Sequence, residues 1–75
     1  MDQKRHSLLI VDDEVDVLDS LRHQFHRTYR VLTSVSGSQA IEILERDDVE
    51  LILSDQRMPG MSGDVLLRKA REMKP

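Results

Sequence analysis

The spacing of apolar residues changes along this chain, and that change constrains the fold more than any other feature. Strand-like stretches alternate with segments whose apolar residues recur every three or four positions, typical of one helix face. The predicted strands are residues 7–11 (SLLIV), 29–34 (YRVLTS) and 49–54 (VELILS). The first is a continuous apolar run, typical of a strand covered on both faces, and the second is more mixed. The helical segments are 14 to about 28, a second that follows Ser36-Gly37-Ser38 and ends at about Arg46, and a last one from about 63 to 74. The pattern therefore predicts strand and helix in alternation, three times over.

The predicted helices each carry an apolar face, and the second has a start signal in Ser36-Gly37-Ser38, which supplies cap and turn chemistry. These faces comprise Val17, Leu18, Leu21 and Phe25 in the first helix, Ala40, Ile41 and Leu44 in the second, and Val65, Leu66, Leu67 and Ala70 in the third. Short helical crossovers join parallel strands in a right-handed sense. The chain is therefore predicted to be an α/β domain with a parallel sheet.

Acidic residues follow two of the three predicted strands. Asp12 and Asp13 come directly after the first strand, and Asp55 comes directly after the third. Ligands of open parallel sheets bind outside the carboxyl ends of the strands, and neighbouring strands lie about 4.8 Å apart. If the two strands are neighbours, the three carboxylates share one small cleft.

Three carboxylates at that spacing repel one another unless a hard cation lies among them. Mg²⁺ suits such a site, because it takes one or two carboxylates and keeps water and phosphate oxygens as its other ligands. A projecting aspartate beside the metal could then accept a phosphoryl group and form an aspartyl phosphate.

Each acidic position also has an ordinary structural explanation. Asp12 or Asp13 could cap the first helix, with Asp16 as its capping-box partner. Asp55 could simply start the turn that Pro59 and Gly60 continue. The occurrence of both positions at one edge of the same predicted sheet favours a functional cluster.

Composition excludes several other classes of protein. The 75 residues include 14 acidic and 11 basic ones, and the net charge of −3 has the wrong sign for general binding to nucleic acid. The absence of cysteine excludes disulfides and thiolate chemistry. The apolar runs are too short to cross a membrane. We therefore expect one cytoplasmic domain that contacts neither nucleic acid nor membrane.

Two sequence stretches together resemble a known family. LLIVDDE at 8–14 and LILSDQRMPGMSG at 51–63 closely resemble the receiver domain of two-component response regulators. The resemblance implies a flavodoxin-like fold with strand order 2-1-3. It also implies a non-enzymatic module that takes a phosphoryl group from a sensor histidine kinase and regulates an output such as transcription.

The resemblance also assigns roles to individual residues. Asp55 is the expected phosphoacceptor, and Asp13 and Asp55 are expected to bind Mg²⁺ through their side chains. Arg57 is expected to bind the metal through its backbone carbonyl, and Asp12 through metal-bound water. Gln56 and Arg57 resemble those of receivers joined to enhancer-type transcription activators, such as hydrogenase regulators, or to cyclic-dinucleotide phosphodiesterase domains. The Arg57 side chain either reaches the phosphoryl site or is simply solvated.

The chain matches only the first three-fifths of such a receiver, so residues 1–75 are interpreted as a partial receiver domain without the fourth and fifth βα units. Family members carry a Ser or Thr, a Lys and an aromatic switch residue in those units. One alternative is thus an inactive fragment that self-associates, as a homodimer, through the exposed third strand and the last helix. Val49, Leu51 and Leu53 are expected on one face of that strand and Ile52 on the other.

A second alternative is a phosphatase of the haloacid-dehalogenase type, which also uses an aspartate at a strand end. Such enzymes have a second aspartate two positions later, where this chain has Arg57. Elsewhere, His23 and His26 could form half of a metal site or belong to a solvated helix face. In the family that helix also belongs to the kinase-docking surface. Ser36-Gly37-Ser38 is more typical of a helix cap than of a phosphate loop.

Overall fold

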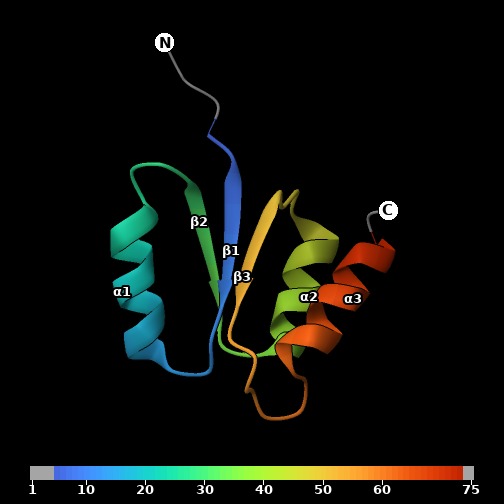
Figure 1. The fold of residues 1–75 in the computed structure, drawn as a ribbon. Helices are drawn as coiled ribbons and strands as arrows, with labels where there is room; N and C mark the ends of the chain where they lie inside the picture. Colours follow the sequence, from blue (N-terminus) through green and yellow to red (C-terminus); the bar gives the residue numbers. More distant parts are fainter. Residues whose placement is uncertain (1–4, 74–75) are drawn as a thin grey trace.

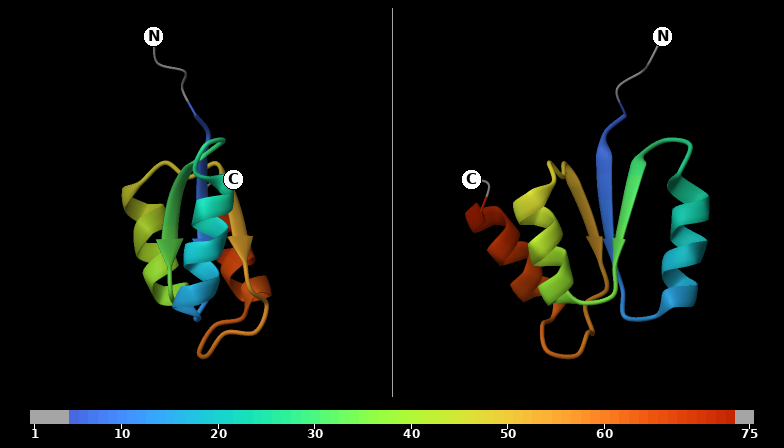
Figure 2. Two further views of the ribbon diagram at one scale, coloured as in Figure 1. Left: turned by 90° about the vertical axis from the view of Figure 1, so that its left-hand side faces the viewer. Right: turned by 180° about the vertical axis from the view of Figure 1, so that it is seen from behind.

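The computed structural model describes residues 5–73, which form a three-stranded parallel sheet with helices on both faces (Figure 1). The elements in chain order are β1 (Ser7–Val11), α1 (Val15–Phe25), β2 (Arg30–Ser34), α2 (Gly37–Arg46), β3 (Leu51–Ser54) and α3 (Gly63–Met73). The strand order is β2-β1-β3, as predicted. Two views from other sides show α1 on one face of the sheet and α2 and α3 together on the other (Figure 2).

The central strand β1 is buried along its whole length because helices cover both of its faces. Leu8 lies opposite Val31 of β2 and Leu51 of β3, and Val11 lies opposite Ser34 and Ser54. All three strands therefore end at the same edge of the sheet. The loops that carry the predicted acidic residues leave from that edge (Figure 1).

The alternation of β1 side chains divides the core into two clusters. On the α2 and α3 side, the buried residues are Leu9, Val11, Ala40, Ile43, Leu44, Met58 and Leu66. On the α1 side they are Leu8, Ile10 and Leu18, with Leu21, Phe25, Tyr29 and Val31 packed against them. The predicted helix faces are largely confirmed, except that Leu67 is exposed and Ile43 is buried.

The first helix is shorter than predicted. It begins at Val15 and ends at Phe25, where the prediction was 14–28. Both Thr28 and Tyr29 donate their backbone N–H groups to the carbonyl of Phe25, which closes a turn and redirects the chain into β2. The second helix ends at Arg46, as predicted, and begins at Gly37, within the predicted cap segment Ser36-Gly37-Ser38. The Ser36 hydroxyl caps it by accepting a 3.1 Å hydrogen bond from the Gln39 N–H.

The third strand also begins two residues later than predicted, at Leu51. The buried hydroxyl of Ser7 donates to the Asp48 carbonyl and accepts from the Glu50 N–H, and the Ser7 N–H donates to a Glu50 carboxylate oxygen. These bonds interrupt the strand pattern before Leu51. Val49 consequently packs with Ile52 against the α2 and α3 side of the core, so its predicted grouping with Leu51 and Leu53 was wrong.

Within the described residues, none of the helices is long and apolar enough to cross a membrane.

Candidate functional site

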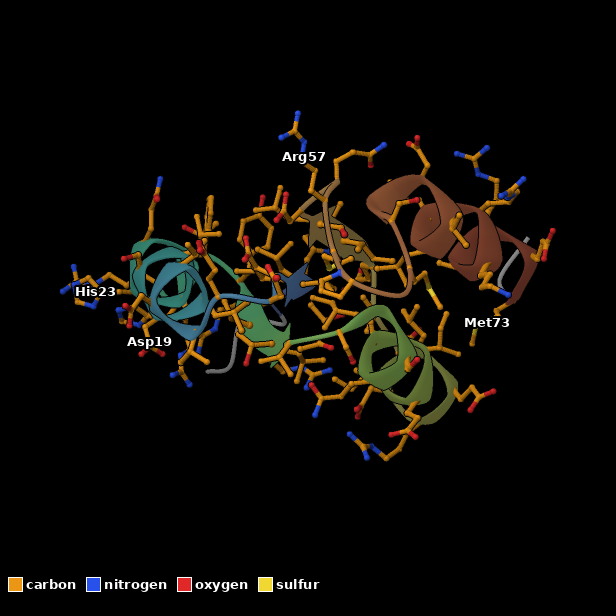
Figure 3. The ribbon with its side chains drawn as sticks, turned by 90° about the horizontal axis from the view of Figure 1, so that it is seen from below. Asp19, His23, Arg57 and Met73 are labelled. Atoms are coloured by element: carbon orange, nitrogen blue, oxygen red, sulfur yellow. The ribbon has the colours of Figure 1, made fainter. Side chains whose placement is uncertain are left out.

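The acidic residues follow the ends of β1 and β3, and backbone hydrogen bonds hold them there. The Asp12 N–H donates to the carbonyl of Ser34 at 3.1 Å, which ties the residue after β1 to the end of β2. The Asp55 N–H donates to the carbonyl of Val11 at 2.9 Å, which ties the residue after β3 to the end of β1. Figure 3 views this edge of the sheet from below. The sheet itself therefore fixes where both acidic sites start.

The three predicted carboxylates come together. One carboxylate oxygen from each of Asp12, Asp13 and Asp55 lies within 4.8 Å of the others. Asp13 is exposed, and Asp55 is half-buried. Each carboxylate carries a formal charge of −1 when ionised, so the cluster concentrates negative charge in a volume that one cation can span. Its donors are all hard oxygens, which fit Mg²⁺.

Capping of the first helix does not explain the acidic pair. The N-cap residue of α1 is Glu14, and it makes no side-chain capping bond. Asp12 accepts a 2.9 Å hydrogen bond from the Glu14 N–H, one residue before the helix starts. The capping box with Asp16 is therefore wrong. The bond orients the Asp12 carboxylate locally while another carboxylate oxygen position remains for the cluster.

Turn formation explains part of the environment of Asp55. Its Oδ1 atom accepts a 3.3 Å hydrogen bond from the Arg57 N–H, the local contact typical of an aspartate that starts a turn. The same carboxylate takes part in the acidic cluster. The two interpretations of Asp55 are therefore compatible, because a carboxylate offers about four lone-pair positions.

The Arg57 side chain is exposed and points away from the body of the molecule (Figure 3). This orientation matches the solvated alternative for the guanidinium. The proposed role of the Arg57 carbonyl as a metal ligand stays a prediction.

A hollow of about 290 Å³ adjoins the cluster on the α1 side of the sheet. It is lined by Ile10, Val11, Asp12, Leu21, Leu53, Ser54 and Asp55. Asp12 and Asp55 thus border open space.

The loop between β3 and α3 is held by residues that sequence reasoning did not select. Met58 is buried in the core, and the Gly63 N–H closes the base of the loop with a 3.2 Å bond to the Gln56 carbonyl. A Cβ atom at Gly63 would lie 2.8 Å from the Asp55 carbonyl oxygen, so this close approach requires glycine. An apolar Met58 inside a polar turn was the available signal.

The remaining candidates do not form a second site. His23 of α1 and His26, the C-cap residue directly after it, are both exposed, and their ring centroids lie 5.7 Å apart. Within residues 5–73, the acidic cluster is the one group of three or more potential metal-binding side chains, so no third ligand joins the histidines. Ser36 acts as a helix cap, as predicted.

Comparison with protein families gives a direct match. The model of the response regulator receiver domain matches residues 8–75. The hydrogenase transcriptional regulatory protein HoxA of Cupriavidus necator is 43% identical over 75 residues, which are all of this chain and 16% of that protein. The response regulator SaeR of Staphylococcus epidermidis is 36% identical over 67 residues, covering 88% of this chain and 29% of that protein.

Solved structures agree with the sequence comparison. A signal receiver domain of an HD domain-containing protein from Pseudomonas fluorescens superimposes with a TM-score of 0.90 and 26% identity, over 96% of this chain and 58% of that one. The receiver domain of the hybrid histidine kinase CckA gives a TM-score of 0.81 and 37% identity, over 87% of this chain and 63% of that one. The chain thus spans less than two thirds of these structures and about a sixth of HoxA. With its strand order and its match from Leu8 onward, the chain belongs to the response regulator receiver domain family.

Proposed function

We propose that this chain accepts a phosphoryl group on Asp55 from a sensor histidine kinase, with Mg²⁺ held in the acidic cluster. The observation that carries the proposal is the convergence of Asp12, Asp13 and Asp55 within 4.8 Å at the carboxyl edge of the sheet. Membership of the receiver family supports it.

The carboxylates of Asp13 and Asp55 and the backbone carbonyl of Arg57 would bind Mg²⁺, and Asp12 would act through metal-bound water. Mg²⁺ would offset the repulsion between the carboxylates and the phosphoryl oxygens. The hydrogen bonds from the Glu14 and Arg57 N–H groups orient the Asp12 and Asp55 carboxylates before any ligand arrives. Such prior orientation lowers the entropic cost of the transfer.

In the transfer step, an Asp55 carboxylate oxygen bonds to phosphorus while the bond from phosphorus to the donor imidazole nitrogen breaks. The imidazole keeps the bonding electron pair, and Asp55 becomes an acyl phosphate. The module is modified once per cycle and turns over no substrate of its own, so we class it as a signalling module and not an enzyme. Arg57 occupies the position where a haloacid-dehalogenase-type phosphatase has its acid/base aspartate, which disfavours that alternative.

Family membership also supports proposals for the output and for the surface that contacts the kinase. Relatives such as HoxA and the transcriptional regulatory protein GlrR of Escherichia coli are named as regulators of transcription, which supports a transcriptional output. The surface proposed for the kinase comprises Arg22 and His23 on the exposed side of α1 and the exposed His26 and Arg27 directly after it. This side of the helix points away from the sheet, as His23 shows (Figure 3).

Acetyl phosphate with Mg²⁺ tests the proposal, and mass spectrometry is the measurement. The unmodified chain should gain one phosphoryl group, and Asp55→Asn should gain none. Asp19→Asn is the matched control, because Asp19 is an exposed aspartate on α1 outside the cluster. Modification that persists in Asp55→Asn would disprove the assignment of the acceptor.

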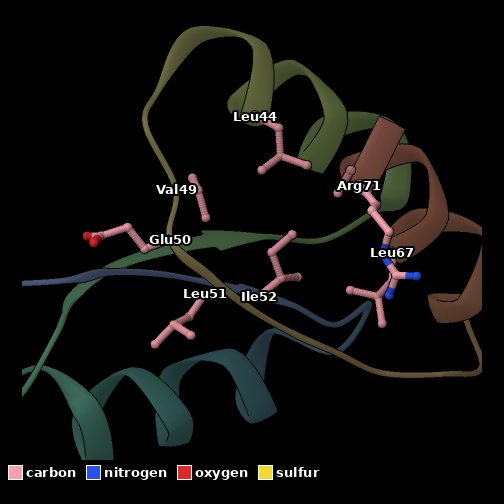
Figure 4. Close-up of a pocket in the computed structure, with 8 residues that line it drawn as sticks. Leu44, Val49, Glu50, Leu51, Ile52, Leu67 and Arg71 are labelled. Carbon is pink, nitrogen blue, oxygen red and sulfur yellow. The ribbon is translucent and has the colours of Figure 1, made fainter. Parts of the chain in front are cut away.

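A second copy of this chain is the partner that we propose for the open side of β3. Within the described residues β3 pairs only with β1. A groove of about 310 Å³ runs beside it (Figure 4), and it is lined by Leu44, Val49, Glu50, Leu51, Ile52, Leu67, Ala70 and Arg71. Leu51 and Leu67 are 44% and 41% exposed.

Charge complementarity favours the second copy over other partners. Asp64, Leu67 and Arg71 lie three and four positions apart, so they share one stripe of α3 with an acid near its start, a leucine in the middle and a base near its end. Two antiparallel copies of this stripe place Asp64 of each opposite Arg71 of the other, around a shared apolar centre. Such a self-complementary patch suits a twofold dimer.

A further inference from the structure

The side chain of Met61 occupies the space directly above Gly37, the first residue of α2. A Cβ atom at Gly37 would lie 2.6 Å from the Met61 Sδ atom and 2.8 Å from its Cβ atom. Real Cβ atoms do not approach other atoms so closely, so any other residue at position 37 would displace Met61. Met61 also packs against the core cluster on this side of the sheet. The loop after Asp55 therefore packs against the start of α2 through Met61.

The start of α2 is in turn bonded to the strand ends that hold Asp12. The Ser34 hydroxyl donates a 2.7 Å hydrogen bond to the carbonyl of Ser36, the residue before Gly37. Ser34 is buried, and its own carbonyl accepts the hydrogen bond from the Asp12 N–H. A continuous set of contacts thus runs from Met61 through Gly37, Ser36 and Ser34 to Asp12. It links the loop that carries Asp55 and Arg57 with the other half of the acidic cluster.

The Asp12–Asp13 pair and Asp55 are connected covalently only through the long chain segment between residues 13 and 55. Their relative position depends on the β1–β3 ladder and on the packing of the loop. The ladder holds the backbone of Asp55, but the Arg57 backbone lies beyond the last ladder bond at Asp55. Met58 holds that region from the core side, and Met61 holds it against α2.

We propose that Gly37 and Met61 are positioning residues, whose contact sets the distance between the Asp55 loop and the Asp12–Asp13 pair. Neither residue offers a ligand to a metal ion or a phosphoryl group at this site. Their effect is on the geometry of the residues that do. The expected change in Mg²⁺ affinity rests on the proposed function, whereas the packing of the loop against α2 does not.

The test compares four variants: Gly37→Ala, Met61→Ala, their combination, and Ser38→Ala as the control. Ser38 is the next residue of the same helix and is exposed, so its change leaves the contact intact. Three quantities are measured: amide hydrogen exchange without metal at Gly63 and Leu66, which donate to the loop carbonyls of Gln56 and Ser62, the Mg²⁺ dissociation constant from amide chemical shifts, and stability in urea.

Gly37→Ala and Met61→Ala should each speed exchange at Gly63 and Leu66 and raise the Mg²⁺ dissociation constant about tenfold, the lower end of the effect of losing outer-shell support. The double variant should bind Mg²⁺ no more weakly than the weaker-binding of the two single variants, because both changes remove the same contact. Ser38→Ala should leave both quantities unchanged.

A loss of stability in urea without any change in exchange or Mg²⁺ affinity, relative to Ser38→Ala, would overturn the proposal. If Gly37→Ala does not fold, Met61→Ala carries the test, because it removes atoms and creates no clash. If the unmodified chain shows no response to Mg²⁺, the proposed function fails. Exchange in the metal-free protein then still decides whether Met61 holds the loop.

Discussion

The backbone N–H of Asp55 donates to the carbonyl of Val11, the residue that immediately precedes Asp12. A single hydrogen bond at 2.9 Å thus joins the start of one acidic loop to the start of the other. Because this bond belongs to the β1–β3 ladder, the two halves of the cluster are brought together by sheet pairing. The site therefore depends on sequence-distant strands being neighbours, which the β2-β1-β3 order provides.

Mg²⁺ affinity should depend on Asp13 more than on any aspartate outside the cluster. Replacing Asp13 by Asn removes one charge and one strong oxygen ligand, so the Mg²⁺ dissociation constant should rise about tenfold. Titration followed by amide shifts near residues 12–14 and 55–58 measures this. Asp19→Asn should titrate like the unmodified chain, and an Asp13→Asn response equal to it would show that the metal assignment is wrong.

Two adjacent leucines of α3 should differ sharply in their contribution to stability. Leu66 is fully buried, whereas Leu67 is 41% exposed. Leu66→Ala should lower the free energy of unfolding by about 2–5 kcal/mol, since it leaves a cavity in the core. Leu67→Ala should change the free energy of unfolding by no more than about 0.5 kcal/mol, as is usual for surface substitutions. Urea unfolding at low protein concentration compares the two, and equal losses would contradict the packing of α3 on the sheet.

The buried hydroxyl of Ser7 should stabilise the edge of the sheet opposite the acidic cluster. Ser7→Ala deletes the bonds to the Asp48 carbonyl and the Glu50 N–H, and the lost pairing should cost about 1–3 kcal/mol. Faster amide exchange at residues 48–51 should accompany the loss. Ser20, exposed on α1, gives the control variant Ser20→Ala. If both variants unfold at the same urea concentration, the Ser7 bonds contribute nothing net.

Self-association should depend on the open side of β3. Leu51→Lys should shift sedimentation toward monomer, because it places a charge on the proposed interface. Val15→Lys is the control, since Val15 is also an exposed apolar residue but lies on α1. A chain that sediments as a monomer at high concentration before any substitution would exclude the dimer.

The charges on α3 give a sharper version of the same test. Arg71→Glu should weaken the dimer, because it sets like charges opposite each other in the antiparallel arrangement. Adding Asp64→Lys should restore association by reversing both partners. A double variant no better than Arg71→Glu would reject the proposed pairing of Asp64 with Arg71.

Simple patterns were enough to predict the acidic cluster. Asp12, Asp13 and Asp55 follow apolar runs, and parallel strands bring their carboxyl ends to one edge whatever the details of packing. The start of α2 was predicted to within the segment Ser36-Gly37-Ser38, because Ser36 caps the helix through a local contact. Most of the fold was therefore predictable from local chemistry and sheet topology.

Other features depend on contacts between distant residues, which one sequence does not reveal. Val49 was assigned to the wrong face because Ser7, more than 40 residues away, bonds to both Asp48 and Glu50 and interrupts the alternation. The contact between Met61 and Gly37 joins the loop after β3 to the start of α2, and the packing of α2 against α3 brings these segments together. Neither residue type at these positions predicts such a contact, because the two residues are far apart in the sequence.

The β1–β3 pairing also fixes the number of residues between Glu50 and Asp55. Glu50 is bonded to Ser7 at one end of the pair and Asp55 to Val11 at the other, with the four residues of β3 between them. Since successive strand residues point to opposite faces, inserting or deleting one residue in 51–54 would turn Asp55 away from Asp12 and Asp13. The turn at 26–29 carries no such constraint on the cluster. Length variation among natural or engineered relatives should therefore be tolerated there and excluded between Glu50 and Asp55.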